Sequence, residues 1–441
     1  MDAVLLVDHQ PIAPPAGPAG VVVRAFLTVA ATVPAHRQRT PLAIALVLDR
    51  SGSMDGDRLE AAKAASISAV ERLHPDDVVS VIAFDGQVDV VALPAPRARH
   101  HQLVQQVNEI DSRGSTNLSG GWLRGRQHME QALGILGSLE GSSRRIVVLT
   151  DGHANAGITD SSTLVELART ARTMGITTTM IGVGEGYDDD LLRAMADAGG
   201  GNSWYVERPD QAHDVLGEEL GNLLSVSAQG LSVTLTLEDS VTVLATHSSW
   251  PATSLANVFT FDLGDLYASE PKPVLLELFV PADRLDALAS RGTPIATLIV
   301  QADVLRDGGG VEHRAMTLGV AASLETQSTL VPAVEHAVLL ARAAKAREEA
   351  ARRQRDGDAD GAQQIMMCAS NLLSSNALAE NSQFSDELQS QVRDLDGLAD
   401  RYQHRDFSEV EAKYQMQRSY NTRRGKKQYD NVLKREPSPR G

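Results

Sequence analysis

The sequence of 441 residues contains one cysteine, Cys368, so no disulfide can form within the chain. Nowhere do eighteen apolar residues run together, and no membrane-spanning helix is therefore expected. The N-terminus lacks both a basic segment and a long apolar core, which argues against a secretory signal peptide. The lack of paired cysteines favours a reducing compartment, and we expect a cytoplasmic protein.

The chain has no surplus of basic residues. It carries 57 acidic against 41 basic side chains, for a net charge of −16 at pH 7. This balance argues against broad nucleic-acid binding. With 42% hydrophobic residues the composition is that of a globular protein, and the length suffices for two or three domains.

A long apolar run near the N-terminus ends in closely spaced polar residues. The unbroken apolar run 43–48 fits a strand buried on both faces of a parallel sheet, and it is followed by Asp49, Ser51 and Ser53. In open α/β sheets, ligands bind in the crevice at the carboxyl ends of the strands. Closely spaced carboxylate and hydroxyl oxygens at that point suit a hard cation such as Mg²⁺.

Two later segments fit the same crevice. The run 146–150 is a second buried-strand pattern, and it ends at Asp151. The polar segment 113–118, which contains Thr116, precedes a long helical pattern. If the strands before Asp49 and Asp151 are neighbours in the sheet, all three segments lie together at the same crevice.

In this order and context the motifs resemble those of the von Willebrand factor type A domains. That family's metal-ion-dependent adhesion site consists of D-x-S-x-S, a threonine in a loop, and an aspartate after a later strand. The resemblance implies a Rossmann-like domain of bacterial type that binds Mg²⁺, or Mn²⁺ or Ca²⁺. It also implies a non-enzymatic role, in which the metal engages an Asp or Glu of an unidentified protein partner. The metal ligands carried over from the family pattern are Asp49, Ser51, Ser53, Thr116 and Asp151.

The flanking sequence predicts further domains. We expect strands in residues 1–40 to join a β-sandwich formed by 227–323, with an α/β domain over 41–226 inserted in that sandwich. Residues 324–420 read as helices, and the basic segment 421–441 is expected to be partly disordered.

The five candidate ligands have two other interpretations, as helix caps and as residues of a hydrolase. Ser and Asp after strands commonly cap the next helix, so the five residues could be an accidental set of caps. A phosphatase-like hydrolase could also use strand-end aspartates, but it would need a second aspartate where Ser51 stands. No G-x-S-x-G elbow surrounds Ser51 or Ser53. No catalytic residue is predicted.

Two other motifs are interpreted as turns. The glycines of segment 182–186 are spaced too closely for a dinucleotide fingerprint, and a tight strand-to-helix turn fits better. Segment 356–361 resembles the start of a calcium loop, but Met367 stands where that loop needs a bidentate glutamate. His153, close to Asp151, is interpreted as a loop residue rather than a base.

Overall fold

The computed structural model describes residues 1–12, 19–31, 41–137, 141–184, 186–268, 270–306, 310–321, 330–380 and 382–426. These residues form two compact units. The α/β unit contains the described part of Val33–Gln229 together with Asp303–His313, and the second unit contains the described parts of Met1–Thr32, Gly230–Ala302 and Arg314–Asn431.

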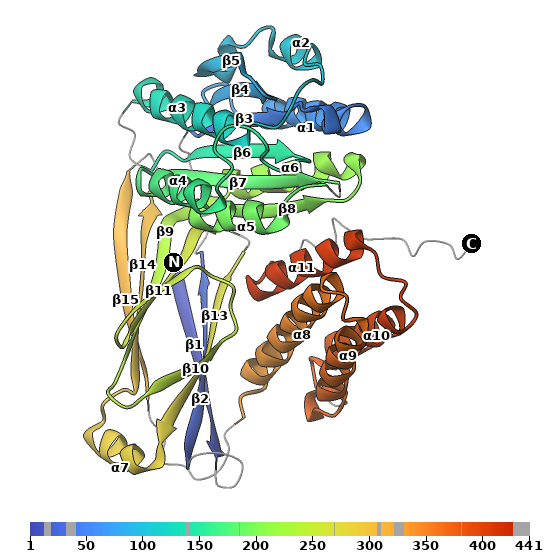
Figure 1. Ribbon diagram of the computed structural model, residues 1–441. Coiled ribbons are helices and arrows are strands. Elements are labelled where there is room, and N and C mark those ends of the chain that lie inside the picture. The colour runs from blue at the N-terminus through green and yellow to red at the C-terminus, as the bar shows by residue number, and fades with distance from the viewer. Residues whose placement is uncertain are drawn as a thin grey trace. The chain divides into compact units, whose positions relative to one another are not determined.

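The α/β unit is built on a six-stranded sheet with the order β5-β4-β3-β6-β7-β8. Only β5 runs antiparallel to its neighbour, and it lies at the edge (Figure 1). Every residue of β3, β4 and β7 is buried, as the unbroken apolar runs predict for strands covered on both faces. The strands are β3 (Ala43–Asp49), β4 (Val78–Phe84), β5 (Val88–Pro96), β6 (Arg144–Thr150), β7 (Ile176–Val183) and β8 (Gly200–Val206).

Helices alternate with these strands along the chain and cover the sheet. Helix α1 packs against α6, α4 packs against α5, and α3 lies on β3, β4 and β6 (Figure 1). This arrangement confirms the predicted α/β class with a central parallel sheet flanked by helices. The helices are α1 (Asp57–Arg72), α2 (Leu103–Asn108), α3 (Leu118–Leu136), α4 (Ser161–Thr173), α5 (Asp189–Ala198) and α6 (Ala212–Leu224).

Two further β-sheets, with strand orders β1-β2-β13-β10 and β11-β12-β9-β14-β15, belong for the most part to the second unit. Strand β2 pairs antiparallel with β13, so that Leu27 lies opposite Val274. The N-terminal strands therefore complete a sheet whose other members follow the α/β unit in sequence. The strands are β1 (Asp2–Ile12), β2 (Gly20–Ala30), β9 (Val226–Leu237), β10 (Thr242–Thr246), β11 (Ala252–Leu255), β12 (Val258–Tyr267), β13 (Lys272–Pro281), β14 (Ala296–Leu305) and β15 (Val311–Val320), and α7 (Ala282–Arg291) follows β13.

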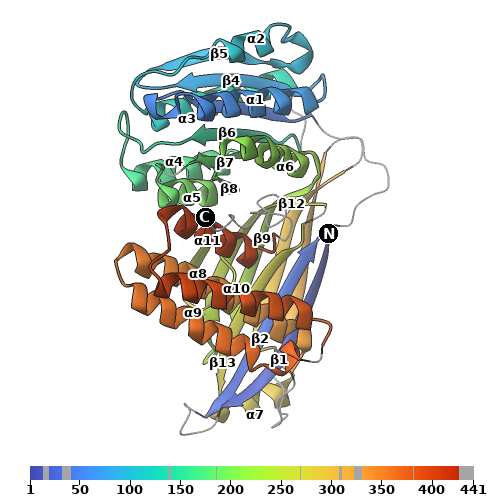
Figure 2. The same cartoon turned by 90° about the vertical axis from the view of Figure 1, so that its right-hand side faces the viewer.

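A C-terminal helical region packs on the first of these sheets within the same unit (Figure 2). Val334 and Val338 of α8 form one apolar cluster with Leu275 and Phe26 of the sheet. The four main helices are α8 (Pro332–Arg355), α9 (Ala359–Ser374), α10 (Ser385–Gln403) and α11 (Glu409–Arg423). None of the helices that the structure describes has the length and apolar composition needed to cross a bilayer.

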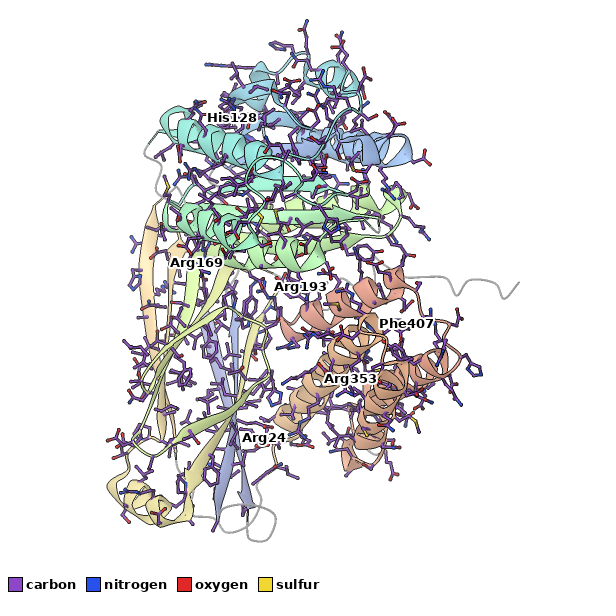
Figure 3. The ribbon with its side chains drawn as sticks, viewed as in Figure 1. Arg24, His128, Arg169, Arg193, Arg353 and Phe407 are labelled. Atoms are coloured by element: carbon purple, nitrogen blue, oxygen red, sulfur yellow. The ribbon has the colours of Figure 1, made fainter. Side chains whose placement is uncertain are left out.

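An ion cluster joins the helical region to the N-terminal strands. Arg24 of β2, labelled in Figure 3, is buried and donates to both carboxylate oxygens of Asp8 on β1, at 2.7 and 2.5 Å. It also pairs with Glu335 of α8. Most of the basic tail predicted to be partly disordered, residues 427–441, lies outside the described residues, but Arg423 donates to the carbonyl of His247 at 3.0 Å.

Candidate metal centre

The register of two strands brings the predicted carboxylates to the same edge of the α/β sheet. Strands β3 and β6 are parallel neighbours, with Leu48 opposite Leu149. Asp49 ends β3, and Asp151 directly follows the last residue of β6. Both side chains therefore emerge where the carboxyl ends of parallel strands form a crevice.

The two serines connect these carboxylates. The backbone N–H of Ser51 donates to Asp49 Oδ1 at 2.8 Å, and the Oγ atoms of Ser51 and Ser53 are 3.1 Å apart. Ser53 Oγ in turn donates to Asp151 Oδ1 at 2.7 Å. Hydrogen-bonded polar groups thus connect the end of β3 with the end of β6.

Thr116 reaches the same place from the loop before α3. Its N–H donates to Asn155 Oδ1 at 2.7 Å, which ties this loop to the loop after β6. A Cβ placed on Gly152 would lie 3.0 Å from Thr116 Oγ1 and 3.7 Å from Asp49 Oδ2. Both oxygens therefore face the space that this glycine leaves open. The structure brings all five predicted residues into one crevice.

The five side chains do not serve as helix caps. Ser51 precedes a 3₁₀ turn but makes no side-chain capping hydrogen bond, and α1 begins after Gly56. The capping side chains of α3 and α4 are Asn117 and Asp160. The capping interpretation therefore does not account for the cluster.

Asp49 carries the main electrostatic feature of the site. Burial, together with the nearby charge of Asp151, raises the pKa of Asp49 to about 6, although hydrogen bonds from Thr150 and Ser51 oppose the shift. Among the described residues no Lys, Arg or His forms an ion pair with Asp49, whose partners are Ser51 and the hydroxyl of Thr150 at 2.5 Å. A buried carboxylate without a cation favours the binding of one.

The donor set fits a hard divalent ion. Two carboxylates and three hydroxyls offer only oxygen, which Mg²⁺, Mn²⁺ and Ca²⁺ prefer. In the part of the chain that the structure describes, no group of three or more His, Cys, Asp or Glu side chains is close enough to hold a metal. Any metal at this crevice therefore depends on the hydroxyls as well as on the two aspartates.

An ion network beside the crevice was not foreseen from the sequence. The Nε atoms of Arg50 and Arg113 lie 2.9 and 2.8 Å from Asp85 Oδ2, and both guanidinium groups also pair with Asp89. Burial alone would raise the pKa of Asp85, but the N–H of Gln87 and the two guanidinium groups lower it below its ordinary value. The network joins the Ser51 loop, the Thr116 loop and the β4–β5 turn.

Another basic residue, Arg58, contacts a predicted metal ligand directly. Arg58 Nη1 lies 2.5 Å from Asp151 Oδ2. The sequence gives one sign of this contact, since Arg58 is a basic residue in the first turn of α1, where the helix dipole favours acids. That signal is faint, because a single exposed arginine at such a position costs only tenths of a kcal/mol.

The other motifs have structural roles. Asp358 caps α9 by accepting from Gly361 N at 2.9 Å, and it pairs with Arg353 (Figure 3). Gly184 has φ +75° in the turn between β7 and α5, although residue 185 lies outside the described residues. His153 is an exposed loop residue.

Comparison with known proteins identifies the α/β unit. Residues 43–218 match the family model of the von Willebrand factor type A domain. An uncharacterised protein of Synechocystis sp. is 32% identical over 189 residues, which are 42% of this chain and 42% of that protein. The inter-alpha-trypsin inhibitor heavy chain H1 of Mesocricetus auratus is 28% identical over 210 residues, 46% of this chain and 22% of that protein. This chain thus spans less than half the length of these curated relatives.

Solved structures share the fold over most of the chain. A von Willebrand factor type A protein from Catenulispora acidiphila matches with a TM-score of 0.63 at 18% identity, covering 88% of this chain and 89% of that one. The ArnB paralog VWA2 from Sulfolobus acidocaldarius matches with a TM-score of 0.51 at 14% identity, covering 96% and 99%. Residues 43–218 of this chain therefore form a von Willebrand factor type A domain.

Proposed function

We propose that this domain is a divalent-metal-dependent protein-binding module without chemical turnover. Domains of this type commonly mediate protein–protein interaction, and the proposal adds the metal and the kind of group that is bound. The observation that carries it is the convergence of Asp49, Ser51, Ser53, Thr116 and Asp151 in one crevice, with Asp49 buried and free of any described cationic partner.

In this proposal the five ligands are of two kinds, neutral and negatively charged. Ser51, Ser53 and Thr116 offer neutral oxygens, and Asp49 and Asp151 supply two negative charges. An Mg²⁺ ion held mainly by the neutral hydroxyls, with the carboxylates acting largely through bound waters, would keep part of its positive charge and an open position for a carboxylate. The loops 50–57, 113–118 and 151–157 surround that position and would form the contact face for an Asp or Glu of the partner protein.

Metal binding is the first test. Isothermal titration of the EDTA-treated protein with Mg²⁺, Mn²⁺ and Ca²⁺ should show one site, and Asp151→Ala should abolish the heat. Asp214→Ala, which removes an exposed acid from α6, is the matched control. Equal heats for the native protein and for Asp151→Ala would count against the site.

Partner capture is the second test. The immobilised protein should retain a partner from the native lysate with Mg²⁺ present and lose it in EDTA or in the Ser51→Ala/Ser53→Ala variant. The control variant Ser374→Ala/Ser375→Ala removes two exposed hydroxyls at the end of α9 and should behave as the native protein. Partners that stay bound in EDTA and to the Ser51/Ser53 variant would place binding on another surface. Metal-dependent hydrolysis of a generic phosphoester would instead support the hydrolase.

A further inference from the structure

Arg58 is the cationic partner of Asp151 in this structure. Its Nη1 atom lies 2.5 Å from Asp151 Oδ2 and 3.2 Å from the backbone carbonyl oxygen of Ser53. The Asp151 side chain has no exposed surface, whereas 36% of the Arg58 side chain is exposed. Arg58 therefore approaches the carboxylate from the solvent side, along a route by which its guanidinium can also leave.

The position of Arg58 is not explained by the stability of its own helix. It lies in the first turn of α1 beside Asp57 and Glu60, where the helix dipole favours acids and disfavours a cation. A Cβ on Gly184 would lie 3.1 Å from Arg58 Cζ and Nε, so the guanidinium fits beside the turn after β7 because residue 184 has no side chain. The contacts with Asp151 and with the carbonyl of Ser53 thus hold this side chain over the crevice.

We propose that Arg58 acts as an internal cation that holds Asp151 in the metal-free protein and is displaced when a divalent ion binds. This inference rests on the proposed function of the site. Arg58 neutralises Asp151 but leaves Asp49 without a cation, so the charge at the site is only partly balanced. Arg58 then has opposite effects on the two states, because it stabilises the metal-free site and weakens the affinity for metal.

The affinity effect follows from Coulomb repulsion. If the guanidinium stayed about 5 Å from a divalent ion, the two cations would repel by about 1.7 kcal/mol even at the dielectric constant of water. The ion therefore binds only as Arg58 gives up its contact with Asp151, and this loss lowers the affinity on the order of tenfold. Removing the charge of Arg58 should therefore tighten Mg²⁺ binding by about tenfold. The metal-free variant should melt at a lower temperature, because Asp151 loses its ion pair in a buried setting.

Paired measurements on Arg58→Gln test both effects. The metal-free melting temperature should fall, and the Mg²⁺ dissociation constant from calorimetry should fall about tenfold. Arg169→Gln removes the same charge from the exposed face of α4 (Figure 3), where Arg169 pairs with Glu166, and both quantities should stay at native values. Arg58→Lys keeps the charge and should retain an affinity close to native.

A measurement on the native protein gives a result that does not depend on whether the variant folds. In the ¹⁵N spectrum of arginine side chains, the Arg58 Nε signal, assigned with Arg58→Lys, should shift on addition of Mg²⁺ to the native protein while the Arg169 signal stays in place. Native Mg²⁺ affinity in a folded Arg58→Gln, or an Arg58 signal that does not shift at saturating Mg²⁺, would overturn the proposed displacement of Arg58. Neither result would overturn the proposed function. Absence of Mg²⁺ binding in both the native protein and Arg58→Gln would overturn the proposed function as well.

Discussion

Two of the buried carboxylates of the α/β domain, those of Glu219 and Asp49, lie in very different surroundings. Oε1 of Glu219 on α6 accepts from Arg145 at 2.9 Å and from Thr179 at 2.7 Å. Its Oε2 accepts from Asn202 at 2.7 Å and from Trp204 at 2.8 Å. Both Glu219 and Arg145 are fully buried, so this ion pair lies entirely within the core between helix and sheet.

Asp49 is equally buried, but its described partners are the N–H of Ser51 and the hydroxyl of Thr150. With no cation beside it, burial raises its pKa to about 6. Burial alone therefore does not identify a structural carboxylate. A carboxylate that is paired with a cation, such as Glu219, holds helix and sheet together. A buried carboxylate without a cation destabilises the protein until a bound cation neutralises its charge.

The largest expected effect is on Glu219. Truncation in Glu219→Ala removes the carboxylate that pairs with the buried charge of Arg145, which should cost about 3–5 kcal/mol of unfolding free energy. Chemical denaturation followed by circular dichroism measures it. Asp214→Ala, an exposed acid on the same helix, should cost far less. A loss below about 1 kcal/mol for Glu219→Ala would remove the distinction between the two carboxylates.

Asp49→Asn should behave in the opposite way. The raised pKa implies that ionised Asp49 destabilises the metal-free protein by on the order of 2–3 kcal/mol near neutral pH, because each pKa unit corresponds to about 1.4 kcal/mol. The neutral amide should therefore leave the EDTA-treated protein as stable as the native one or more stable. It should abolish the Mg²⁺-dependent rise in melting temperature. A strongly destabilised metal-free Asp49→Asn would show that Asp49 is structural.

Asp85 is an intermediate case, since two guanidinium groups balance it at the edge of the site. Its folded-state pKa is lowered, so its contribution is present above the unfolded value near 4 and is lost as pH falls through the folded value. We expect Asp85→Asn to lose about 1–2 kcal/mol of unfolding free energy at pH 7, and we expect this difference from the native protein to persist down to about pH 4 and to shrink only below it. Thermal melts between pH 2 and 7 test this. A difference that is constant with pH would contradict it.

The smallest effect is expected at an exposed carboxylate. Glu166 pairs with Arg169 at 3.1 Å on α4, and more than half of each side chain is exposed. Glu166→Gln should change the unfolding free energy by less than about 0.5 kcal/mol, because exposed ion pairs are screened by water. The same denaturation assay checks it, and a larger loss would mean that exposure is a poor guide to these differences.

Much of the candidate site could be predicted because it depends on local sequence. Asp49 and Asp151 each follow an unbroken apolar strand, and the carboxyl ends of neighbouring parallel strands must meet. The hydroxyls of Ser51 and Ser53 follow within four residues of Asp49, so they could not lie far from it. Thr116 was placed by its resemblance to the family pattern rather than by spacing.

The charges around the site could not be predicted in the same way. Arg50 and Arg113 reach Asp85 across 35 and 28 residues of sequence, and Arg58 reaches Asp151 across 93. A sequence shows that these residues are charged, but many acids are available to each arginine. The choice depends on strand register and on where each helix begins.

The sequence by itself determined the order of strands and helices, the buried character of the sheet, and the oxygen donors at its edge, because periodicity and strand ends are local properties. Only the tertiary structure decided which charges are balanced. It paired Arg145 with Glu219, placed Arg58 on Asp151 and left Asp49 without a described cation. Ion pairing in a buried setting depends on side chains meeting within a few ångströms, and that proximity exists only once the chain has folded.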